Sequence, residues 1–434
     1  MGSTIFLSES VLSKLAVTLF MMIMFVWGKF PFGLITMTCC LMLAITGVVD
    51  LQSAFTGFGN KIVVLIAPML ALSGVLTKTS LVSRVSDLME YMKNSHGSLL
   101  IISIFAVAAL LAQFIPSTAV LTIMVVFLST LGDTGEITSN RLILPMLGIT
   151  SSWKFRTPLG MGATWFAVIN AMYAGILPDE KYALTMFDPF LFSIIPMIAL
   201  TVFCVFGWRL MPKSSKIDKN AVKQKKQEAT LTHTQEMIVY IVFAVTMLAM
   251  ILNRWTGNLM YLAPGIAVVV LIYVGILKVQ DAVKSMTADM IWMIAGVLVV
   301  ADALGKSGAG ELIGNVLLNM LGENPSSFYV MLLFSAVTVI MTNFLSNTAT
   351  QAVLVPIAAS VALVGGWDPR GIILIAGMAN MYDIAFPSGS GEAAVAFAAG
   401  GYNPMKVLKF SFPYMVITIL TCAISANLMF PIYG

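Results

Sequence analysis

The chain has 434 residues, of which 59% are hydrophobic and only 10% are charged, and its mean hydropathy is +0.94. These values exclude the water-soluble globular class and indicate a polytopic membrane protein. The formal net charge of +4 is informative only through the positions of its basic residues along the chain.

The first apolar run, Val11–Trp27, lacks a charged flank and a small-residue cleavage site, so we interpret it as the first membrane span rather than a signal peptide. Nine further apolar runs are about 17–25 residues long or close to that length. Four of them follow in the first half and five in the second: Phe32–Val49, Ile62–Leu76, a segment around 141–175, Pro189–Leu210, Met237–Leu252, Leu259–Leu277, Met290–Leu304, Gly371–Ala399 and Val407–Phe430.

Each half also holds one longer apolar run that is interrupted in its middle, Leu99–Leu128 in the first and Phe328–Val364 in the second. We interpret residues 99–128 and 328–364 as re-entrant helical hairpins, which enter and leave the membrane on the same side. Five spans per half, with hairpins that add no crossing, give the two halves opposite orientations. The sequence therefore predicts an all-α polytopic membrane protein of two inverted-topology repeats, each with five spans and a re-entrant hairpin.

A polar, lysine-rich segment, Pro212–Glu236, divides the chain into a first repeat at 1–211, a linker at 212–236 and a second repeat at 237–434. Basic loops favour the cytoplasm, so this linker is predicted inside and the N-terminus outside. Counting spans outward from a cytoplasmic linker places Lys278 and Lys284 inside and the 178–181 loop outside. We expect a multi-pass protein of the plasma, or inner, membrane. Amphipathic stretches at 78–96 and 306–323 are predicted to lie along the interface.

A short polar motif occurs twice, as Phe114–Ala119 (FIPSTA) and Phe344–Ala349 (FLSNTA), 230 residues apart (346 − 116 = 230). A Pro-x-Gly-x-Gly sequence follows each copy, at Pro158–Gly162 and Pro387–Gly391, 229 residues apart (387 − 158 = 229). Proline removes a helix donor and glycine permits close backbone approach, so we expect a broken helix at both places. Duplicated polar breaks in membrane helices are the best sequence indication of a transporter's binding site.

The two motif tips differ in chemistry. Ser346, Asn347 and Thr348 offer two hydroxyls and a carboxamide, and Thr342 lies one helical turn before them on the same face. Such oxygens, with freed backbone carbonyls, can coordinate a sodium ion, while helix N-termini favour anions. The first tip has Pro116, Ser117 and Thr118 instead.

Four charged residues fall in the apolar breaks: Lys154, Arg156, Asp383 and Glu392. Charge inside a membrane is costly and is functional by default. One interpretation makes Lys154 or Arg156 a partner of an anionic substrate and Asp383 or Glu392 a cation- or proton-linked carboxylate. The other is mutual pairing, or placement near the membrane edge. Lys154 and Asp383 occupy equivalent repeat positions (383 − 154 = 229).

The segment Phe344–Thr350 (FLSNTAT) and the order of spans, hairpins and breaks resemble the divalent anion/sodium symporter family of the ion-transporter superfamily. The resemblance implies that the hairpin tips and broken spans bind substrate carboxylates and sodium. It also implies transport by an elevator mechanism and a homodimeric protein. It implies substrate contacts at Ser117, Thr118, Ser346, Asn347, Thr348, Ser390 and Gly391, and sodium contacts at Thr342, Ser346, Asn347, Gly389, Ser117 and Gly160. The chain departs from the family at its first tip, where Ala112 replaces an upstream hydroxyl, and at Ser390-Gly391-Glu392-Ala393.

We expect a secondary transporter of small divalent anions, with C4-dicarboxylates such as succinate and malate favoured and sodium as the coupling ion. Citrate, tartrate, malonate and sulfate, proton coupling or exchange, and an ion channel remain alternatives. An intramembrane enzyme would need paired acids, and the spacing of Asp383 and Glu392 matches no catalytic pattern. No Walker motif is present, so an ion gradient must drive transport. Four cysteines without Cys-x-x-Cys spacing and two histidines provide no metal or haem ligand set, so we expect no cofactor, and we expect no nucleic-acid partner.

Overall fold

The computed structural model describes residues 9–80, 98–130, 138–212, 231–252, 255, 258–305, 309–322 and 324–433. Within these ranges the chain forms helices and no strand, which confirms the predicted helical fold class. Most of the interfacial stretch predicted at 78–96, and linker residues 213–230, lie outside the described residues.

The described helices divide between the two halves of the chain. The first half comprises α1 (Glu9–Trp27), α2 (Phe32–Ile45), η1 (Ser53–Gly59), α3 (Lys61–Leu76), α5 (Ser98–Leu111), α6 (Ser117–Thr130), α7 (Ser139–Trp153), α8 (Gly162–Tyr173), η2 (Glu180–Tyr182), α9 (Asp188–Gly207) and η3 (Trp208–Leu210). The second comprises α10 (His233–Ile251), α12 (Leu259–Tyr273), α13 (Val279–Met286), α14 (Asp289–Gly305), α15 (Ala309–Leu321), α16 (Ser327–Phe344), α17 (Asn347–Gly365), α18 (Arg370–Met378), η4 (Ala379–Met381), α19 (Gly391–Gly400) and α20 (Pro404–Met429).

Local capping explains where several helices begin. The Thr232 hydroxyl accepts from the amide of Gln235, whose side chain accepts from the Thr232 amide, which makes a capping box. Helix α10 therefore starts at His233, four residues before the apolar run that predicts it. Ser326 caps α16 by a single hydrogen bond, in which its hydroxyl accepts from the amide of Tyr329.

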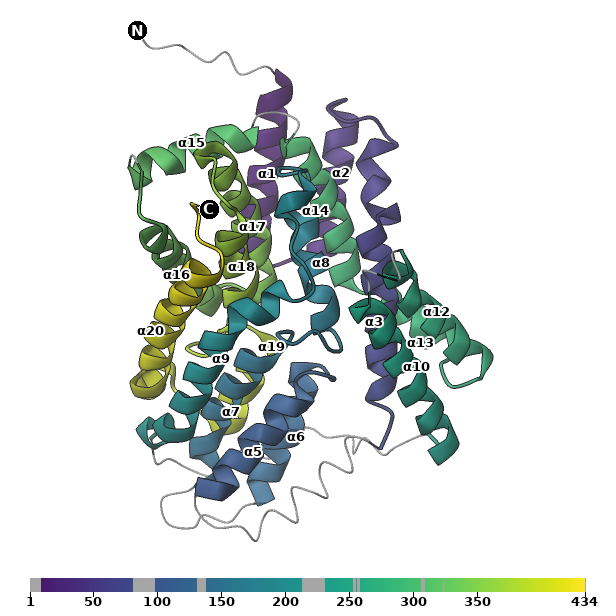
Figure 1. Cartoon of the computed structure of the whole chain (residues 1–434), viewed down its shortest axis with the longest axis vertical. Helices are drawn as coiled ribbons and strands as arrows, with labels where there is room; N and C mark the ends of the chain where they lie inside the picture. Colours follow the sequence, from purple (N-terminus) through teal and green to yellow (C-terminus); the bar gives the residue numbers. More distant parts are fainter. Residues whose placement is uncertain are drawn as a thin grey trace.

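Both duplicated motifs interrupt a helix. Residues 112–116 separate α5 from α6, residues 345–346 separate α16 from α17, and the two helices of each pair contact each other. Figure 1 shows α5 and α6 at the lower end of the molecule and α17 towards the opposite end. This arrangement fits two hairpins that approach from opposite sides. Their re-entry into a membrane stays a prediction, as do the domain boundaries.

Each Pro-x-Gly-x-Gly sequence also breaks a helix, as predicted. Residues 154–161 lie between α7 and α8, and residues 382–390 lie between η4 and α19. The segments predicted at 141–175 and 371–399 are therefore pairs of short helices. Each break begins several residues before its proline.

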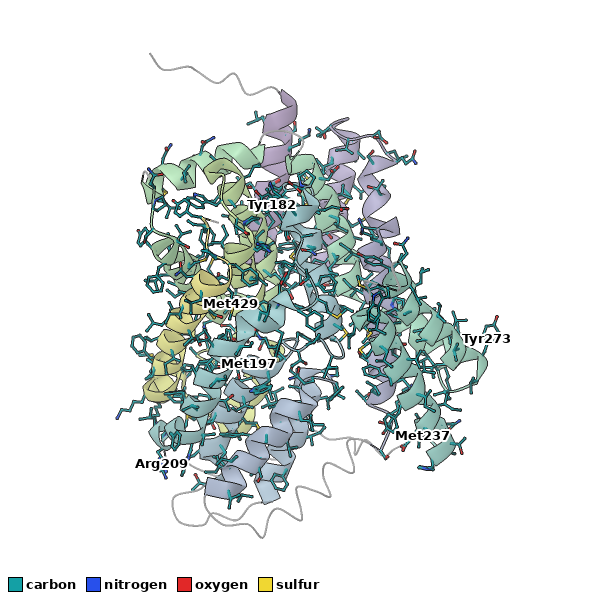
Figure 2. All side chains as sticks on the ribbon, in the orientation of Figure 1. Tyr182, Met197, Arg209, Met237, Tyr273 and Met429 are labelled. Carbon is teal, nitrogen blue, oxygen red and sulfur yellow. The ribbon has the colours of Figure 1, made fainter. Side chains whose placement is uncertain are left out.

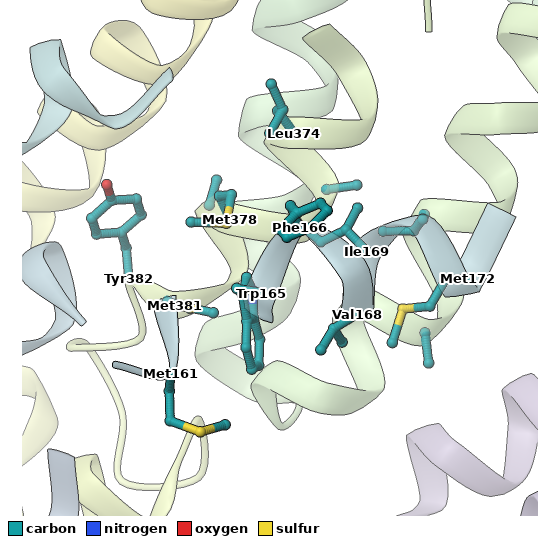
Figure 3. Close-up of a cluster of buried hydrophobic side chains, with 14 of the residues drawn as sticks. Met161, Trp165, Phe166, Val168, Ile169, Met172, Leu374, Met378, Met381 and Tyr382 are labelled. Atoms are coloured by element: carbon teal, nitrogen blue, oxygen red, sulfur yellow. The ribbon is translucent and has the colours of Figure 1, made fainter. Parts of the chain in front are cut away.

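The short helices of the two breaks pack crosswise between the repeats: α8 contacts α18, and α19 contacts α7. Figure 3 shows Trp165 and Ile169 of α8 among Leu374, Met378 and Met381. The Trp165 indole donates to the Gly377 carbonyl at 3.3 Å, and a Cβ on Gly377 would lie 2.7 Å from Ile169 Cδ1. Glycine at 377 therefore permits this close approach.

The helices form two packed groups. One contains α1–α3, η1, α10 and α12–α14, and the other contains α5–α9 and α16–α20, with α15 packed on α17. Within the first group, a Cβ on Gly57 would lie 1.9 Å from the Ala295 carbonyl oxygen, so η1 and α14 are in direct backbone contact. Helix α8 lies at the boundary, where it contacts α3 and α14.

The outward faces of many helices are apolar. Exposed side chains include Ile198 and Phe206 of α9, at 59% and 66% exposure, and Tyr273 at 87%, which projects from the side of the molecule in Figure 2. Such faces are typical of contact with lipid. Six described helical segments are long and apolar enough to cross a membrane, or seven if the bent η1–α3 pair counts as one span. The chain is thus a multi-pass membrane protein. The expected number of ten spans stays a prediction, since central breaks shorten several helices.

Candidate functional site

The second hairpin tip starts helix α17 with a serine cap. The Ser346 hydroxyl accepts from the amide of Ala349 at 3.1 Å, because an extended residue with a short polar side chain satisfies a free first-turn donor. Asn347 and Thr348 form the first turn and are half-buried. The N-terminal end of α17, with its partial positive charge, thus lies half-buried at the hairpin tip.

Three oxygens from three elements meet beside this tip. The Thr342 hydroxyl of α16 donates to Asn347 Oδ1 at 2.8 Å and also contacts the Asn380 carbonyl oxygen of η4. A hydroxyl carries one proton, so it can satisfy only one of these two acceptors at a time. The Asn380 side chain holds the group together by donating to the Asn347 carbonyl at 2.8 Å.

A fully buried carboxylate borders the same three oxygens. Asp383 is 0% exposed, and its Oδ1 accepts from Asn347 Nδ2 at 3.2 Å. Within the described residues, Asp383 Oδ2 and Asn380 Oδ1 are buried and have no hydrogen-bond partner. Buried acceptors without donors are costly. We call Thr342, Asn347, Asn380 and Asp383 the oxygen cluster; its surplus of acceptors suits a cation.

Glycine brings each break against the end of its own hairpin. A Cβ on Gly389 would lie 2.8 Å from both the Thr342 carbonyl oxygen and Asp383 Cβ. In the first repeat, a Cβ on Gly160 would lie 2.2 Å from the Gln113 carbonyl oxygen, and Gly160 has a φ of +55°. Both glycines are therefore required by backbone contact between a break and a hairpin.

The first tip lies against the break of the second repeat. Ser117 starts α6 and is 3% exposed, whereas Thr118 is exposed and its Cγ2 would lie 3.7 Å from a Cβ on Gly391. The neighbouring Ser390 caps α19 by accepting from the amide of Ala393 at 3.1 Å. Two helix N-termini, those of α6 and α19, thus lie side by side.

Two buried side-chain amides, which the sequence reasoning missed, hydrogen-bond the breaks to the hairpins. Gln113 Nε2 donates to the carbonyl oxygens of Ala109 and Trp153 at 3.0 and 2.8 Å, and its Oε1 accepts from the Thr157 hydroxyl at 2.6 Å. Asn343 Nδ2 donates to the Val339 carbonyl at 2.7 Å, and its Oδ1 accepts from the Ala385 amide at 2.8 Å. Both residues stand directly before the motif phenylalanine (343 − 113 = 230), a repeated signal that could have identified them.

Two of the charged residues predicted as partners form an ion pair. Lys154 Nζ lies 3.4 Å from Glu392 Oε2, and their side chains are 4% and 15% exposed. The charges of both act on Asp383. The lysine ends α7 and the glutamate begins α19, so the pair joins the breaks of the two repeats.

Arg156 is 1% exposed and points elsewhere. Its guanidinium donates to the Met378 carbonyl at 2.9 Å, contacts the Ser193 hydroxyl at 3.5 Å and lies 4.6 Å from the centre of the Tyr382 ring. These contacts tie the first break to the end of α18, the start of the second break and α9. A role as a substrate partner stays a prediction.

Comparisons with known proteins agree with this architecture. A family model described as "Citrate transporter" matches residues 22–377. An uncharacterized transporter of Haemophilus influenzae is 22% identical over 395 residues, which cover 87% of this chain and 83% of that protein. The sodium-dependent dicarboxylate transporter SdcS of Staphylococcus saprophyticus is 19% identical, covering 98% of this chain and 87% of that protein. Three further curated relatives match over less than half of their own length.

A crystal structure of the Alcanivorax borkumensis YdaH transporter, described as having an unusual topology, is similar with a TM-score of 0.63. The two chains are 14% identical, and the match covers 94% of this chain and 98% of that one. At this identity the likeness concerns the fold alone.

Proposed function

Because the chain belongs to the citrate transporter family, and is thus a secondary transporter of the citrate and dicarboxylate type, we propose that it carries C4-dicarboxylates together with sodium. The observation that carries the sodium half of this proposal is the oxygen cluster. Its three oxygens and one buried carboxylate come from α16, α17, η4 and the following break, where helix ends leave carbonyls free. The transporter SdcS, named as sodium-dependent, is one of its relatives.

The anion would bind where the helix N-termini gather. Helices α6, α8, α17 and α19 all begin at hairpin tips or breaks, and the half-buried Thr348 and exposed Thr118 offer hydroxyls there. Free first-turn amides and the helix dipole favour carboxylates at such ends. Ser346, Asn347 and Ser117 belong to the same tips, and Ser390 and Gly391 to the adjoining break.

Electrostatics supply a reason for coupling. At an effective dielectric constant of about 20, two like unit charges about 4 Å apart repel by about 4 kcal/mol, which is roughly a thousandfold in affinity. Sodium bound beside Asp383 would remove that repulsion between the carboxylate and an incoming dianion. Anion binding would therefore require the cation, and transport would be a symport.

The movement we propose is an elevator. The packed group of α5–α9 and α16–α20 holds the whole candidate site, and the group of α1–α3, α10 and α12–α14 would be the fixed scaffold. Helix α15, at the end of the molecule in Figure 1, would connect the two as an arm. We further propose a homodimer in the cytoplasmic membrane, with the linker inside and the N-terminus outside.

Citrate is the second candidate substrate, because the matching family model is described as a citrate transporter. The test is uptake of labelled succinate, citrate and sulfate into proteoliposomes, with sodium, proton and counter-substrate gradients imposed one at a time. We expect saturable succinate uptake that depends on the sodium gradient. Uptake driven only by protons or by counter-substrate would contradict sodium coupling, and unsaturable flux would indicate a channel.

In the same assay, Asn347→Ala should abolish uptake, because it removes both a cluster oxygen and the amide that binds Asp383. Thr342→Ala should raise the sodium concentration for half-maximal uptake more than Ser117→Ala does. Asn258→Ala, an exposed change at the start of α12 in the proposed scaffold, is the matched control and should behave like the unmodified protein. Normal uptake by Asn347→Ala would remove the second tip from the site.

A further inference from the structure

The repeat position that holds a carboxylate in the oxygen cluster holds a lysine in the other repeat. Asp383 follows η4 in the second break, and Lys154 follows α7 in the first (383 − 154 = 229). Both are buried, at 0% and 3% exposure. An acid and a base thus stand at pseudo-symmetric places in one interior.

The other three members of the oxygen cluster are also changed in the first repeat. Thr342 corresponds to Ala112 (342 − 112 = 230), Asn347 to Ser117 (347 − 117 = 230) and Asn380 to Ser151 (380 − 151 = 229). The hydroxyl is lost, and the carboxamides are replaced by shorter hydroxyls. Asn380 contributes its backbone carbonyl to the cluster, which any residue has, but the Thr342 hydroxyl and the Asn347 carboxamide have no full equivalent in the first repeat. The first repeat therefore offers fewer oxygens to a free cation.

Lys154 brings a positive charge to the first break and pairs there with an acceptor of the second repeat. Its ammonium lies 3.4 Å from Glu392 Oε2, and a buried ammonium without such a partner would be strongly unfavourable. Arg156, the other buried cation of the break, is directed to the Met378 carbonyl and the Tyr382 ring. Lys154 is thus the cation whose charge acts on Asp383 and Glu392 together.

We propose that the Lys154 ammonium is a built-in cation that takes the place of a dissociable ion in the first repeat, with Glu392 as its counter-charge. Only the oxygen cluster of the second repeat then binds sodium, and one lysine sets the number of sodium ions that each transport cycle requires. This inference rests on the proposed function, because that function identifies the ion as sodium. The replacement of a bound ion by the fixed charge of Lys154 does not depend on which substrate is carried.

The test measures sodium-dependent thermal stability of the purified full-length protein in detergent, titrated with sodium chloride against choline chloride. For the unmodified protein we expect a single-site curve, with a Hill coefficient of about one. Lys154→Met leaves Glu392 without its cation, so sodium should be recruited there. The sodium-induced rise in melting temperature should become larger. The number of sodium ions bound per protein, counted by equilibrium binding of radioactive sodium, should rise from about one to about two. In Lys154→Met/Glu392→Gln the additional response should disappear.

The inference would be overturned if the sodium titration of Lys154→Met matched that of the unmodified protein. It would also be overturned if Lys154→Met lost affinity for succinate while its sodium response stayed unchanged, because Lys154 would then be a substrate ligand. If Lys154→Met does not fold, the exchanged pair Lys154→Glu/Glu392→Lys keeps the charges and should retain the single-site curve; a two-site curve would contradict the inference. Failure of the proposed function can be distinguished from failure of this inference. If the proposed function is wrong, the unmodified protein shows no succinate uptake, whereas the sodium response that Lys154→Met gains is measured without substrate.

Discussion

At the scale of single residues, the site depends on positions where only one side chain, or none, fits. Gly160 combines a left-handed backbone with a contact that leaves no room for a Cβ beside the Gln113 carbonyl. Thr342 must place one hydroxyl between two acceptors. Such requirements are local, but the neighbours that impose them come from distant parts of the chain.

We therefore predict that Gly160→Ala lowers stability by at least about 2 kcal/mol, the sum of a left-handed alanine and an overpacked contact. Gly47→Ala is the matched control, because Gly47 has a φ of +68° and open space around its Cβ position. Gly47→Ala should lower the free energy of unfolding only through the left-handed backbone of an alanine, by about 1–2 kcal/mol. The measurement is the melting temperature of both variants in detergent. Equal losses would show that the Gln113 contact is not tight.

At the scale of elements, the functional units are helix breaks fastened to hairpin tips. Each break exposes backbone groups in the protein interior, where unpaired amides and carbonyls are costly. Gln113 and Asn343 satisfy several of these groups, and the serine caps at Ser346 and Ser390 satisfy others. Hairpin and break therefore form one rigid piece in each repeat.

Removing either amide should loosen that piece. We expect Gln113→Met and Asn343→Leu each to cost about 1–3 kcal/mol, because a buried backbone partner is left unsatisfied in both. A double-mutant cycle of Gln113→Met with Thr157→Val should give a coupling energy of about 0.5–3 kcal/mol, since the two side chains share a hydrogen bond. Strict additivity of the two melting shifts would contradict the contact.

At the scale of the whole molecule, the two repeats meet crosswise, with α8 on α18 and α19 on α7. The site therefore belongs to neither half alone. The proposed opposite orientation of the repeats predicts where their loops lie. Asp179 and Lys284 are both exposed, and they are expected outside and inside the cell respectively.

Single cysteines at these positions test that topology. A membrane-impermeant maleimide should label Asp179→Cys in intact cells and Lys284→Cys only after permeabilisation. The four natural cysteines are buried, so their background labelling should be low. Labelling of both positions from the same side would refute the inverted arrangement.

Composition, apolar run length and the duplicated motifs by themselves determined much of this protein. They predict a helical membrane protein and the helix breaks at both Pro-x-Gly-x-Gly sequences, because hydrophobic length and helix-breaking residues are local properties of the chain. The transporter family is implied by the resemblance that Phe344–Thr350 and the order of segments carry. The apolar run predicts a start for α10 that is four residues too late, because the capping box before it is polar.

Only the tertiary structure decided which polar groups meet. Asn380 carries no motif, yet its carbonyl joins Thr342 and its side chain binds Asn347. The sequence interpretation left Lys154 and Glu392 open between substrate binding and mutual pairing, and the fold brings them into one ion pair across the two repeats. The physical reason is distance along the chain. Residues 238 positions apart (392 − 154 = 238) have no shared local signal, and their contact exists only because two broken helices cross.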